Sequence, residues 1–406
     1  MRRVVVTGMG IVSCIGDNVD EVAASLKAGK SGIATDADMV SHGFRSQISG
    51  RPGVDPKDFI HKRSYRFMTE TSGWPGVAMM EAIEQSGLTE DMISNPRTGI
   101  VAGSGGPSSM TIVKAADTTR EKGAPKRIGP FAVPKAMSST VSATLATHFK
   151  IKGVNYSITS ACTTSLHCIG SAVEQIQWGK QDIMFAGGGE EVEWTMSDMF
   201  DAMGAMSSKY NDTPTTASRA FDVSRDGFVI AGGAGMVVLE EYEHAKKRGA
   251  NILAEVTGYA ATSDGYDMVA PSGEGAERAM RLALADAGHD VCYINPHATA
   301  TPVGDVAECA AIARVFGADI PDAPMISATK SMTGHSLGAA GAQEAIYSLI
   351  MMQEGFIAPS INITELDPEI PKINIVQQTR DHNMKAFMSN SFGFGGTNGS
   401  VIMRKI

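Results

Sequence analysis

The feature that most constrains the fold of this chain is a restart of its strand pattern near residue 250. Val6–Gly8 and Val256–Gly258 share the sequence Val-Thr-Gly, and each closes a short apolar run. Short apolar runs that end in a turn residue predict buried strands. We therefore expect an internal duplication, with one half in residues 1–250 and the other in residues 251–406. The spacings downstream of the echo differ, so the sequence alone does not align the two halves.

The composition agrees with a large α/β unit and excludes several classes of protein. Of the 406 residues, 43% are hydrophobic, and no linker-like segment divides the chain, so we expect one continuous core. A net charge of −9 argues against general nucleic-acid binding. No window approaches the run of about 18 apolar residues that a membrane span needs. Five cysteines without a CxxC pair or a secretory leader predict a reducing, cytoplasmic setting.

Glycines near the N-terminus raise the alternative of a dinucleotide-binding fingerprint. Gly8, Gly10 and Gly16 have the spacing G-x-G-x5-G, which does not match that motif, and no acidic residue ends a second strand about 20 residues later. We expect these glycines to serve backbone turns. The loop Gly103–Pro107 lacks the lysine and hydroxyl residue of a phosphate loop, so nucleotide binding is not predicted either.

Cys162 is the first candidate for chemistry, because it stands between a predicted strand and a predicted helix. The run Val154–Ile158 alternates as a strand does, and Leu166–Trp178 has apolar residues at helical spacing. A cysteine at a helix N-terminus lies at the positive end of the helix dipole, which favours the thiolate. The thiolate is a nucleophile, so Cys162 predicts an enzyme that forms an acyl-cysteine. The alternative is a small core residue.

Two histidines and a lysine occur in similar small-residue loops after predicted strands. Val291–Asn295 leads to His297, and Met325–Thr329 leads to Lys330 and on to His335 at the start of a predicted helix through Met351. Loops at strand ends commonly carry functional residues, although buried core histidines and a surface lysine remain open as alternatives.

These groups suggest a specific chemistry that needs no metal. Cys162 would hold an acyl group, and its own N–H and that of Phe394, in the glycine-rich turn of the predicted strand Met388–Asn398, would bind the oxyanion. His297 and His335, as neutral imidazoles, would donate hydrogen bonds to a second carbonyl. An enolate stabilised in this way would form as a carboxylate leaves as carbon dioxide, and its carbanion would attack the acyl group.

Four segments in this order resemble the β-ketoacyl-acyl carrier protein synthases, over nearly the whole chain. They are Ser160–Ser165, His297–Asp305, Lys330–His335 and Asn390–Asn398. The runs Phe185–Glu191 and Phe200–Ser207 are more similar to synthase I than to synthase II.

The resemblance implies a thiolase fold, with two pseudo-duplicated α/β halves in five layers (α-β-α-β-α), and an obligate homodimer. It implies that Cys162 carries the acyl chain, that His297 and His335 promote decarboxylation, and that Lys330 orients the site. Phe394 would supply an oxyanion N–H and gate the pocket. The implied substrate-binding and supporting residues are Thr299, Thr301, Phe392, Gly393, Glu308 and Glu344. No metal and no cofactor is implied, because the substrates carry phosphopantetheine on acyl carrier protein.

Two clusters of basic residues occur in this chain, although its net charge is negative. The simplest interpretation is that they are solvated surface residues without a binding role. The resemblance implies instead that they dock the acidic acyl carrier protein, through Lys62, Arg63, Arg66, Lys126 and Arg127. A local positive patch would be needed for fast association between two acidic proteins.

Three residues depart from the family's usual pattern. Ala298 stands where the family usually has glycine, and a Cβ there is costly if the backbone has positive φ. Pro296 replaces a small residue, and Pro107 replaces a glycine near the acyl pocket. We expect activity to survive all three changes, with a possible effect on chain-length preference.

The main hypothesis is therefore a decarboxylating condensing enzyme that elongates fatty acids. A ketosynthase of a polyketide or other specialised pathway is the alternative. A non-catalytic chain-length factor is disfavoured because such subunits lack the active cysteine. A thiolase is disfavoured because no second catalytic cysteine lies near the C-terminal glycine turn.

Overall fold

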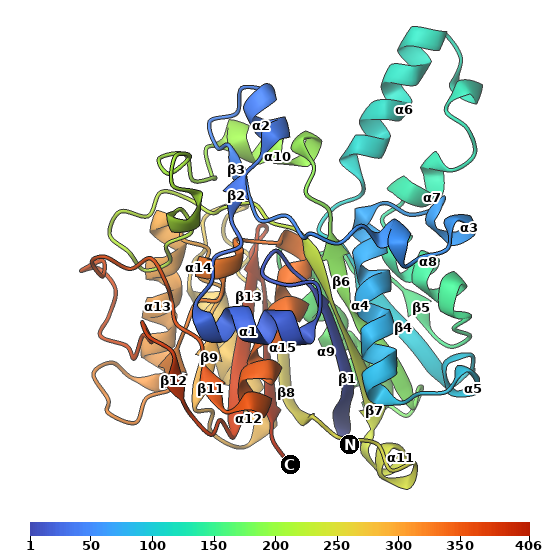
Figure 1. Ribbon diagram of the computed structural model, residues 1–406. Helices are drawn as coiled ribbons and strands as arrows, with labels where there is room; N and C mark the ends of the chain where they lie inside the picture. Colours follow the sequence, from blue (N-terminus) through green and yellow to red (C-terminus); the bar gives the residue numbers. More distant parts are fainter.

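The computed structural model describes residues 1–406, which form one ten-stranded mixed sheet covered by helices (Figure 1). The strand order is β10-β9-β13-β14-β8-β1-β7-β6-β4-β5. One side of the sheet consists of β1 (Val4–Val12), β4 (Thr98–Gly103), β5 (Asn155–Tyr156), β6 (Ile183–Glu190) and β7 (Gly233–Glu241). The other side consists of β8 (Ala254–Ser263), β9 (Tyr293–Asn295), β10 (Met325–Ile326), β13 (Ala386–Gly393) and β14 (Thr397–Arg404).

The two strands whose sequences echo each other meet at the middle of this sheet. β1 and β8 are antiparallel and pair over three positions only, from Val4 opposite Val256 to Val6 opposite Ala254. Such a short ladder allows the two five-stranded groups to fold back over each other on either side of it. The groups can therefore stack as two separate layers.

Helices fill the space between the two groups of strands and cover both outer faces. α9 (Thr164–Gln177) and α15 (Ala340–Glu354) contact strands of both groups and lie between them, as Figure 1 shows. α4 (Glu70–Ser86) and α8 (Thr140–Phe149) cover the face of β1, β7, β6 and β4, and α12 (Glu274–Ala287) covers β8 and β14 with α13 (Pro302–Phe316) beside it. The result is the five-layered α-β-α-β-α arrangement of a thiolase fold, which confirms the predicted fold class.

The remaining elements are short or lie outside these layers. The other helices are α1 (Val19–Ala28), α2 (Ala37–Ser41), α3 (Lys62–Tyr65), α5 (Glu90–Ile93), α6 (Ser109–Lys122), α7 (Ala132–Ala136), α10 (Trp194–Met203), α11 (Tyr242–Lys247) and α14 (Lys330–Thr333). Short 3-10 turns occur at η1 (Pro56–Asp58), η2 (Pro125–Arg127), η3 (Pro214–Thr216) and η4 (Leu337–Ala339). Two small hairpins pair β2 (Ala34–Thr35) with β3 (Ile48–Ser49) and β11 (Phe356–Ile357) with β12 (Arg380–Asp381). None of the helices combines the length and hydropathy that a membrane crossing requires.

Two of the three glycines near the N-terminus have a different role from the predicted one. Gly8 and Gly10 lie inside β1, so the prediction of turns is wrong for them, whereas Gly16 closes the turn that begins at Ser13, as predicted. A Cβ at either position would overlap a backbone carbonyl of α4, that of Ala82 or of Ala78. The glycines therefore allow the helix backbone to lie directly on the strand.

Some predicted elements have different boundaries because the backbone changes direction at positive φ. The helix expected to run on to Met351 is interrupted at Gly334 (φ 68°) and Leu337 (φ 47°), which leaves α14, η4 and α15. The turn predicted to break the strand Met388–Asn398 is confirmed: it contains Phe394 and joins two antiparallel strands, β13 and β14. Both interruptions bend the chain towards the same cavity.

Candidate active site

A cavity of about 410 Å³ brings Cys162, His297 and His335 together. Each lies close to the end of a strand or the start of a helix: Cys162 precedes Thr163, the N-cap of α9, His297 follows β9, and His335 lies between α14 and η4. The sulfur and one ring nitrogen from each histidine lie within 4.8 Å of one another. The two imidazole rings are 5.1 Å apart and nearly perpendicular, at 88°. Residues from three distant parts of the sequence thus face one space.

Cys162 is held in a tight loop and faces the cavity. Burial raises the pKa of its thiol to about 11, while the charge of Lys330 and the N–H groups of Phe394 and of Cys162 itself lower it. Desolvation therefore outweighs these groups that favour the thiolate, and the contribution of the helix dipole stays a prediction. The two N–H groups that point at the sulfur are those expected to bind an oxyanion.

Both histidines are neutral and have ring nitrogens free for a ligand. Burial lowers the pKa of His297 and of His335 well below the usual value, and the nearby charge of Lys330 lowers both further. Nδ1 of His297 and both ring nitrogens of His335 have no hydrogen-bond partner in the protein. Buried polar atoms usually have partners. Two unpaired neutral imidazoles therefore face the cavity ready to donate hydrogen bonds.

Lys330 and Glu344 form a buried ion pair behind the histidines. Both side chains are almost fully buried, so Lys330 is not a surface residue. Burial raises the pKa of Glu344 to about 7, and Lys330 opposes that rise. Neither residue lines the cavity, so this ion pair is placed to act on a substrate only through the two histidines.

The loop after His297 is fixed by a carboxylate and has unusual backbone angles. Glu308, which lines the cavity, accepts hydrogen bonds from the N–H groups of His297 (2.8 Å) and Ala298 (2.7 Å). Burial raises the pKa of Glu308 to about 7. Ala298 and Ala300 have φ of 26° and 68°. The cost expected for a Cβ at Ala298, about 1 kcal/mol, therefore applies here.

The other predicted substrate-binding residues line the same cavity. Thr299 and Thr301 place their hydroxyl oxygens 3.3 Å apart. Phe392 and Gly393 end β13, and Phe394 follows in the turn, with its ring 6.4 Å from that of Phe200. Pro296 and Pro107 do not line the cavity.

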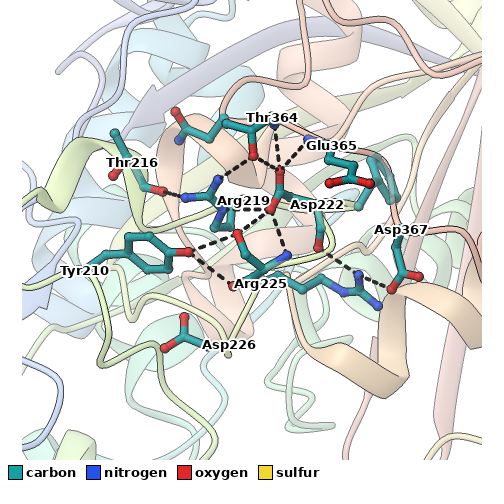
Figure 2. Close-up of polar contacts among 12 residues, drawn as sticks. Tyr210, Thr216, Arg219, Asp222, Arg225, Asp226, Thr364, Glu365 and Asp367 are labelled. Carbon is teal, nitrogen blue, oxygen red and sulfur yellow. Dashed lines mark hydrogen bonds and ion pairs between the residues drawn. The ribbon is translucent and has the colours of Figure 1, made fainter.

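Sequence patterns did not identify the polar network that supports the Thr299–Thr301 loop (Figure 2). The buried guanidinium of Arg225 donates to the carbonyls of Thr301 (3.1 Å) and Pro302 (2.6 Å) and pairs with Asp367 (2.6 Å). It thus clamps the first turn of α13. The only local signal is a short run of charged residues before β7, whose partners are distant in sequence.

Asp222 ties this network to a second loop. Its buried carboxylate accepts the backbone N–H groups of Ser224 (2.8 Å), Thr364 (2.6 Å) and Glu365 (3.1 Å). Figure 2 shows Thr364 and Glu365 beside Asp222. Burial raises the pKa of Asp222, but hydrogen bonds from Ser224 and Thr364 outweigh that effect and hold it below its usual value.

Glu190 is a further buried carboxylate near the cavity. It accepts the N–H groups of Gly105 (2.6 Å) and Gly338 (3.0 Å), and burial raises its pKa to about 8. It thereby joins the loop after β4 to the loop that carries His335. An acidic residue at the end of a wholly buried strand was the sequence signal for it.

The two basic clusters lie on exposed segments that are joined by an aromatic contact. Lys62 and Arg63 are on α3, and Lys126 and Arg127 are on η2. Between them, the guanidinium of Arg66 lies 4.8 Å from the ring of Phe67 and 5.4 Å from that of Phe131. The clusters therefore form one basic surface, which we call the basic patch: Lys62, Arg63, Arg66, Lys126 and Arg127.

One set of residues offers ligands to a metal ion. Cys162, His297 and His335 are ligand types that a thiophilic cation accepts. The positive charge near both histidines opposes cation binding there.

The fold and the cavity together are those of a thiolase-type acyltransferase. Models of the beta-ketoacyl synthase N-terminal and C-terminal domains match residues 1–245 and 253–364. The chain therefore belongs to the beta-ketoacyl synthase family.

Similar proteins cover the whole chain. The 3-oxoacyl-[acyl-carrier-protein] synthase 1 of Escherichia coli K12 is 58% identical over 407 residues, which cover 100% of both chains. This confirms the resemblance to synthase I. A beta-ketoacyl synthase from Burkholderia phymatum has a similar structure, with a TM-score of 0.94, 37% identity and 100% coverage of both chains. A ketosynthase in complex with its type II polyketide acyl-carrier protein has a TM-score of 0.89 and 30% identity, over 100% of this chain and 99% of that chain.

Proposed function

We propose that this chain is the condensing enzyme that elongates fatty acids, forming 3-oxoacyl-acyl carrier protein and carbon dioxide from an acyl chain and malonyl-acyl carrier protein. The observation that carries the proposal is the convergence of Cys162, His297 and His335 on one cavity. The full-length similarity to synthase 1 of E. coli supports this substrate class.

The first step transfers the acyl chain to Cys162. Its sulfur attacks the thioester carbon, and the N–H groups of Cys162 and Phe394 stabilise the tetrahedral oxyanion. The bond from that carbon to the pantetheine sulfur then breaks. Because Cys162 rests as a thiol, its proton ends on the departing carrier thiol.

The second step releases carbon dioxide from the malonyl unit. His297 and His335 donate hydrogen bonds to its thioester carbonyl, which stabilises the enolate as the bond between the malonyl α-carbon and its carboxylate breaks and carbon dioxide leaves. Neutral imidazoles suit this role, since they keep the proton they share with the oxygen. Burial keeps both imidazoles neutral, the charge of Lys330 adds to that effect, and Glu344 pairs with Lys330.

The third step joins the two chains. The enolate carbon attacks the acyl carbon, a carbon–carbon bond forms, and the bond to the Cys162 sulfur breaks. The Cys162 thiolate then takes a proton from solvent. In sum, an acyl-carrier, a malonyl-carrier and one proton yield a 3-oxoacyl-carrier, carbon dioxide and a free carrier thiol.

Thr299 and Thr301 would hold the pantetheine arm, while Phe392 and Gly393 line its path and Phe394 gates it. The hydrogen bonds that Glu308 accepts and those that Arg225 donates fix the loop that carries the two threonines. The chemistry uses groups of the chain and the carrier-bound substrates, and we propose no metal or cofactor for it.

The proposed partner is acyl carrier protein, docked on the basic patch. The patch is exposed on an otherwise acidic chain, which would steer an acidic carrier towards it. The related ketosynthase in complex with an acyl-carrier protein supports this type of partner. We place the enzyme in the cytoplasm with these substrates.

We also propose a homodimer of two-halved subunits, divided at residues 250 and 251. β5 is the edge of the large sheet and its residues are exposed, which leaves a row of backbone groups unpaired. Ile112 and Val113 on α6 and Val133 on α7 are exposed apolar residues, and α6 buries none of its residues within the subunit. Figure 1 shows α6 projecting from the body of the subunit. Sedimentation as a monomer at micromolar concentration would contradict this assembly.

A polyketide or other specialised ketosynthase is the second candidate, and the 30% identity to such an enzyme supports it less than the 58% identity supports fatty-acid elongation. A chain-length factor is disfavoured because every reacting group is present. The test is incubation with acyl- and malonyl-acyl carrier protein. We expect 3-oxoacyl product with saturated acyl donors, and turnover of polyketide starters alone would favour the second candidate.

A further inference from the structure

The loop that carries Cys162 is joined to the β13–β14 hairpin through the side chain of Thr163. Thr163 is fully buried, and its hydroxyl donates to the carbonyl of Thr397 at 2.9 Å, with the carbonyl of Ser391 3.3 Å away. These two carbonyls belong to β14 and β13. One hydroxyl group therefore contacts both strands, on either side of the turn that holds Phe394.

The hairpin and the nucleophile loop approach each other so closely that a side chain in place of either hairpin glycine would crowd the loop. A Cβ on Gly393 would lie 3.1 Å from the backbone nitrogen of Cys162 and 3.1 Å from the Thr163 hydroxyl. A Cβ on Gly399 would lie 3.0 Å from the Thr163 methyl carbon. Thr163 is thus packed on its polar and its apolar side by the same hairpin.

Two further hydrogen bonds join the hairpin to the loop that carries Cys162. The hydroxyl of Ser391 donates to the carbonyl of Cys162 at 2.9 Å, and that of Thr397 to the carbonyl of Ser160 at 3.4 Å. Each of these hydroxyls reaches from one strand only. Thr163 is the member that reaches both strands at once.

This junction bears on catalysis because the two oxyanion donors lie on its two sides. The N–H of Cys162 belongs to the loop, and the N–H of Phe394 belongs to the hairpin turn. An oxyanion site works only when both donors are fixed at hydrogen-bond distance from one oxygen. Their separation depends on how firmly the loop and the hairpin are held together.

We propose that Thr163 is a positioning residue that sets the distance between the Cys162 and Phe394 N–H groups. The inference rests on the proposed function and adds a residue to it. Thr163 touches no reacting atom. Loss of its hydroxyl should slow acyl transfer to Cys162, since a small displacement of a fixed group lowers a rate by about tenfold to a hundredfold.

The experiment compares two substitutions at this position. Thr163→Val keeps the shape and removes the hydroxyl, and Thr163→Ser keeps the hydroxyl. The rate of acyl-enzyme formation from acyl-carrier protein is followed by mass spectrometry. We expect Thr163→Val to slow it about tenfold to a hundredfold at unchanged KM, and Thr163→Ser to stay within about threefold of the parent. Thr144→Val is the matched control, because it removes a buried hydroxyl of α8 that bonds the Thr140 carbonyl, away from the cavity.

Decarboxylation separates this role from general damage. In a Cys162→Gln background, malonyl decarboxylation uses the histidines and not the oxyanion donors. Adding Thr163→Val should therefore leave that rate within about twofold. Equal acylation by Thr163→Val and parent, or an equal loss of acylation and decarboxylation, would overturn the inference. Absence of decarboxylation in the Cys162→Gln parent would instead contradict the proposed function.

Discussion

Replacing Lys330 with methionine tests the electrostatic design of the site. The substitution keeps a similar volume and removes the charge that faces Glu344 and both histidines. Burial already raises the pKa of Glu344 from 4.5 to about 7 with Lys330 present, so without the lysine its pKa should rise further. Its carboxyl group would then stay protonated in the folded variant at neutral pH.

The stability difference should therefore depend on pH. A raised folded pKa gives stability at low pH that is lost as pH rises through that pKa. In the parent this loss ends near pH 7, where the folded Glu344 is ionised, while in Lys330→Met it continues. The free energy of unfolding of the variant should drop below that of the parent by about 1.4 kcal/mol for each pH unit above 7. The difference should approach the roughly 3–5 kcal/mol that is typical of a broken buried ion pair.

The histidines should respond in the opposite sense. Their pKa values are depressed in the folded parent, so they reduce stability as pH falls below 6.5. Removing Lys330 raises both values, and the acid limb of the pH–rate profile for malonyl decarboxylation should move to higher pH.

Denaturant unfolding between pH 5 and 9 measures the first effect, and decarboxylation rates over the same range measure the second. The double variant Lys330→Met/Glu344→Gln is the control, because it lacks the titrating carboxyl group and should show no growing gap above pH 7. A difference in the free energy of unfolding that has the same size at every pH, together with an unchanged acid limb of the pH–rate profile, would refute the reasoning.

Three further predictions follow from the same geometry. Cys162→Gln should lose condensation yet keep or raise malonyl decarboxylation, because the amide mimics an acylated side chain; a silent variant, measured by carbon dioxide release, would count against His297 and His335 acting without the thiol. Lys62→Glu/Arg66→Glu should weaken carrier binding by tenfold or more and flatten its salt dependence in titrations at 50 and 300 mM salt; unchanged affinity would move the docking site elsewhere. Ala298→Gly should change stability by less than about 1 kcal/mol, since relief of the φ of 26° is offset by the lost buried methyl group and the freer unfolded chain; a melting shift above about 5 °C would contradict that balance.

The site residues that the sequence predicted best are those that follow the ends of predicted strands. Cys162, His297 and Lys330 each follow a short apolar run, and such runs place their last residues at one edge of a sheet. The family resemblance then fixed the five-layered arrangement. The catalytic roles stay predictions, because geometry alone brings groups together without showing turnover.

Long-range packing accounts for what the sequence did not predict. The direction of the Cys162 pKa depends on desolvation by residues far along the chain, whereas the helix dipole is visible locally. The Gly8 and Gly10 backbones touch α4, which begins some sixty residues later. The Asp222 cradle likewise needs Thr364, which no local pattern links to it.

The most direct test of the account follows the acyl group and carbon dioxide together in one reaction. Purified enzyme is loaded with acyl-carrier protein, its mass is recorded, and malonyl-carrier protein is then added. We predict one acyl group per chain, located on the Cys162 peptide, and then one carbon dioxide released for each 3-oxoacyl product as that acyl group disappears. Product formation by Cys162→Ala at the parent rate, or carbon dioxide released without loss of the bound acyl group, would contradict the central claim.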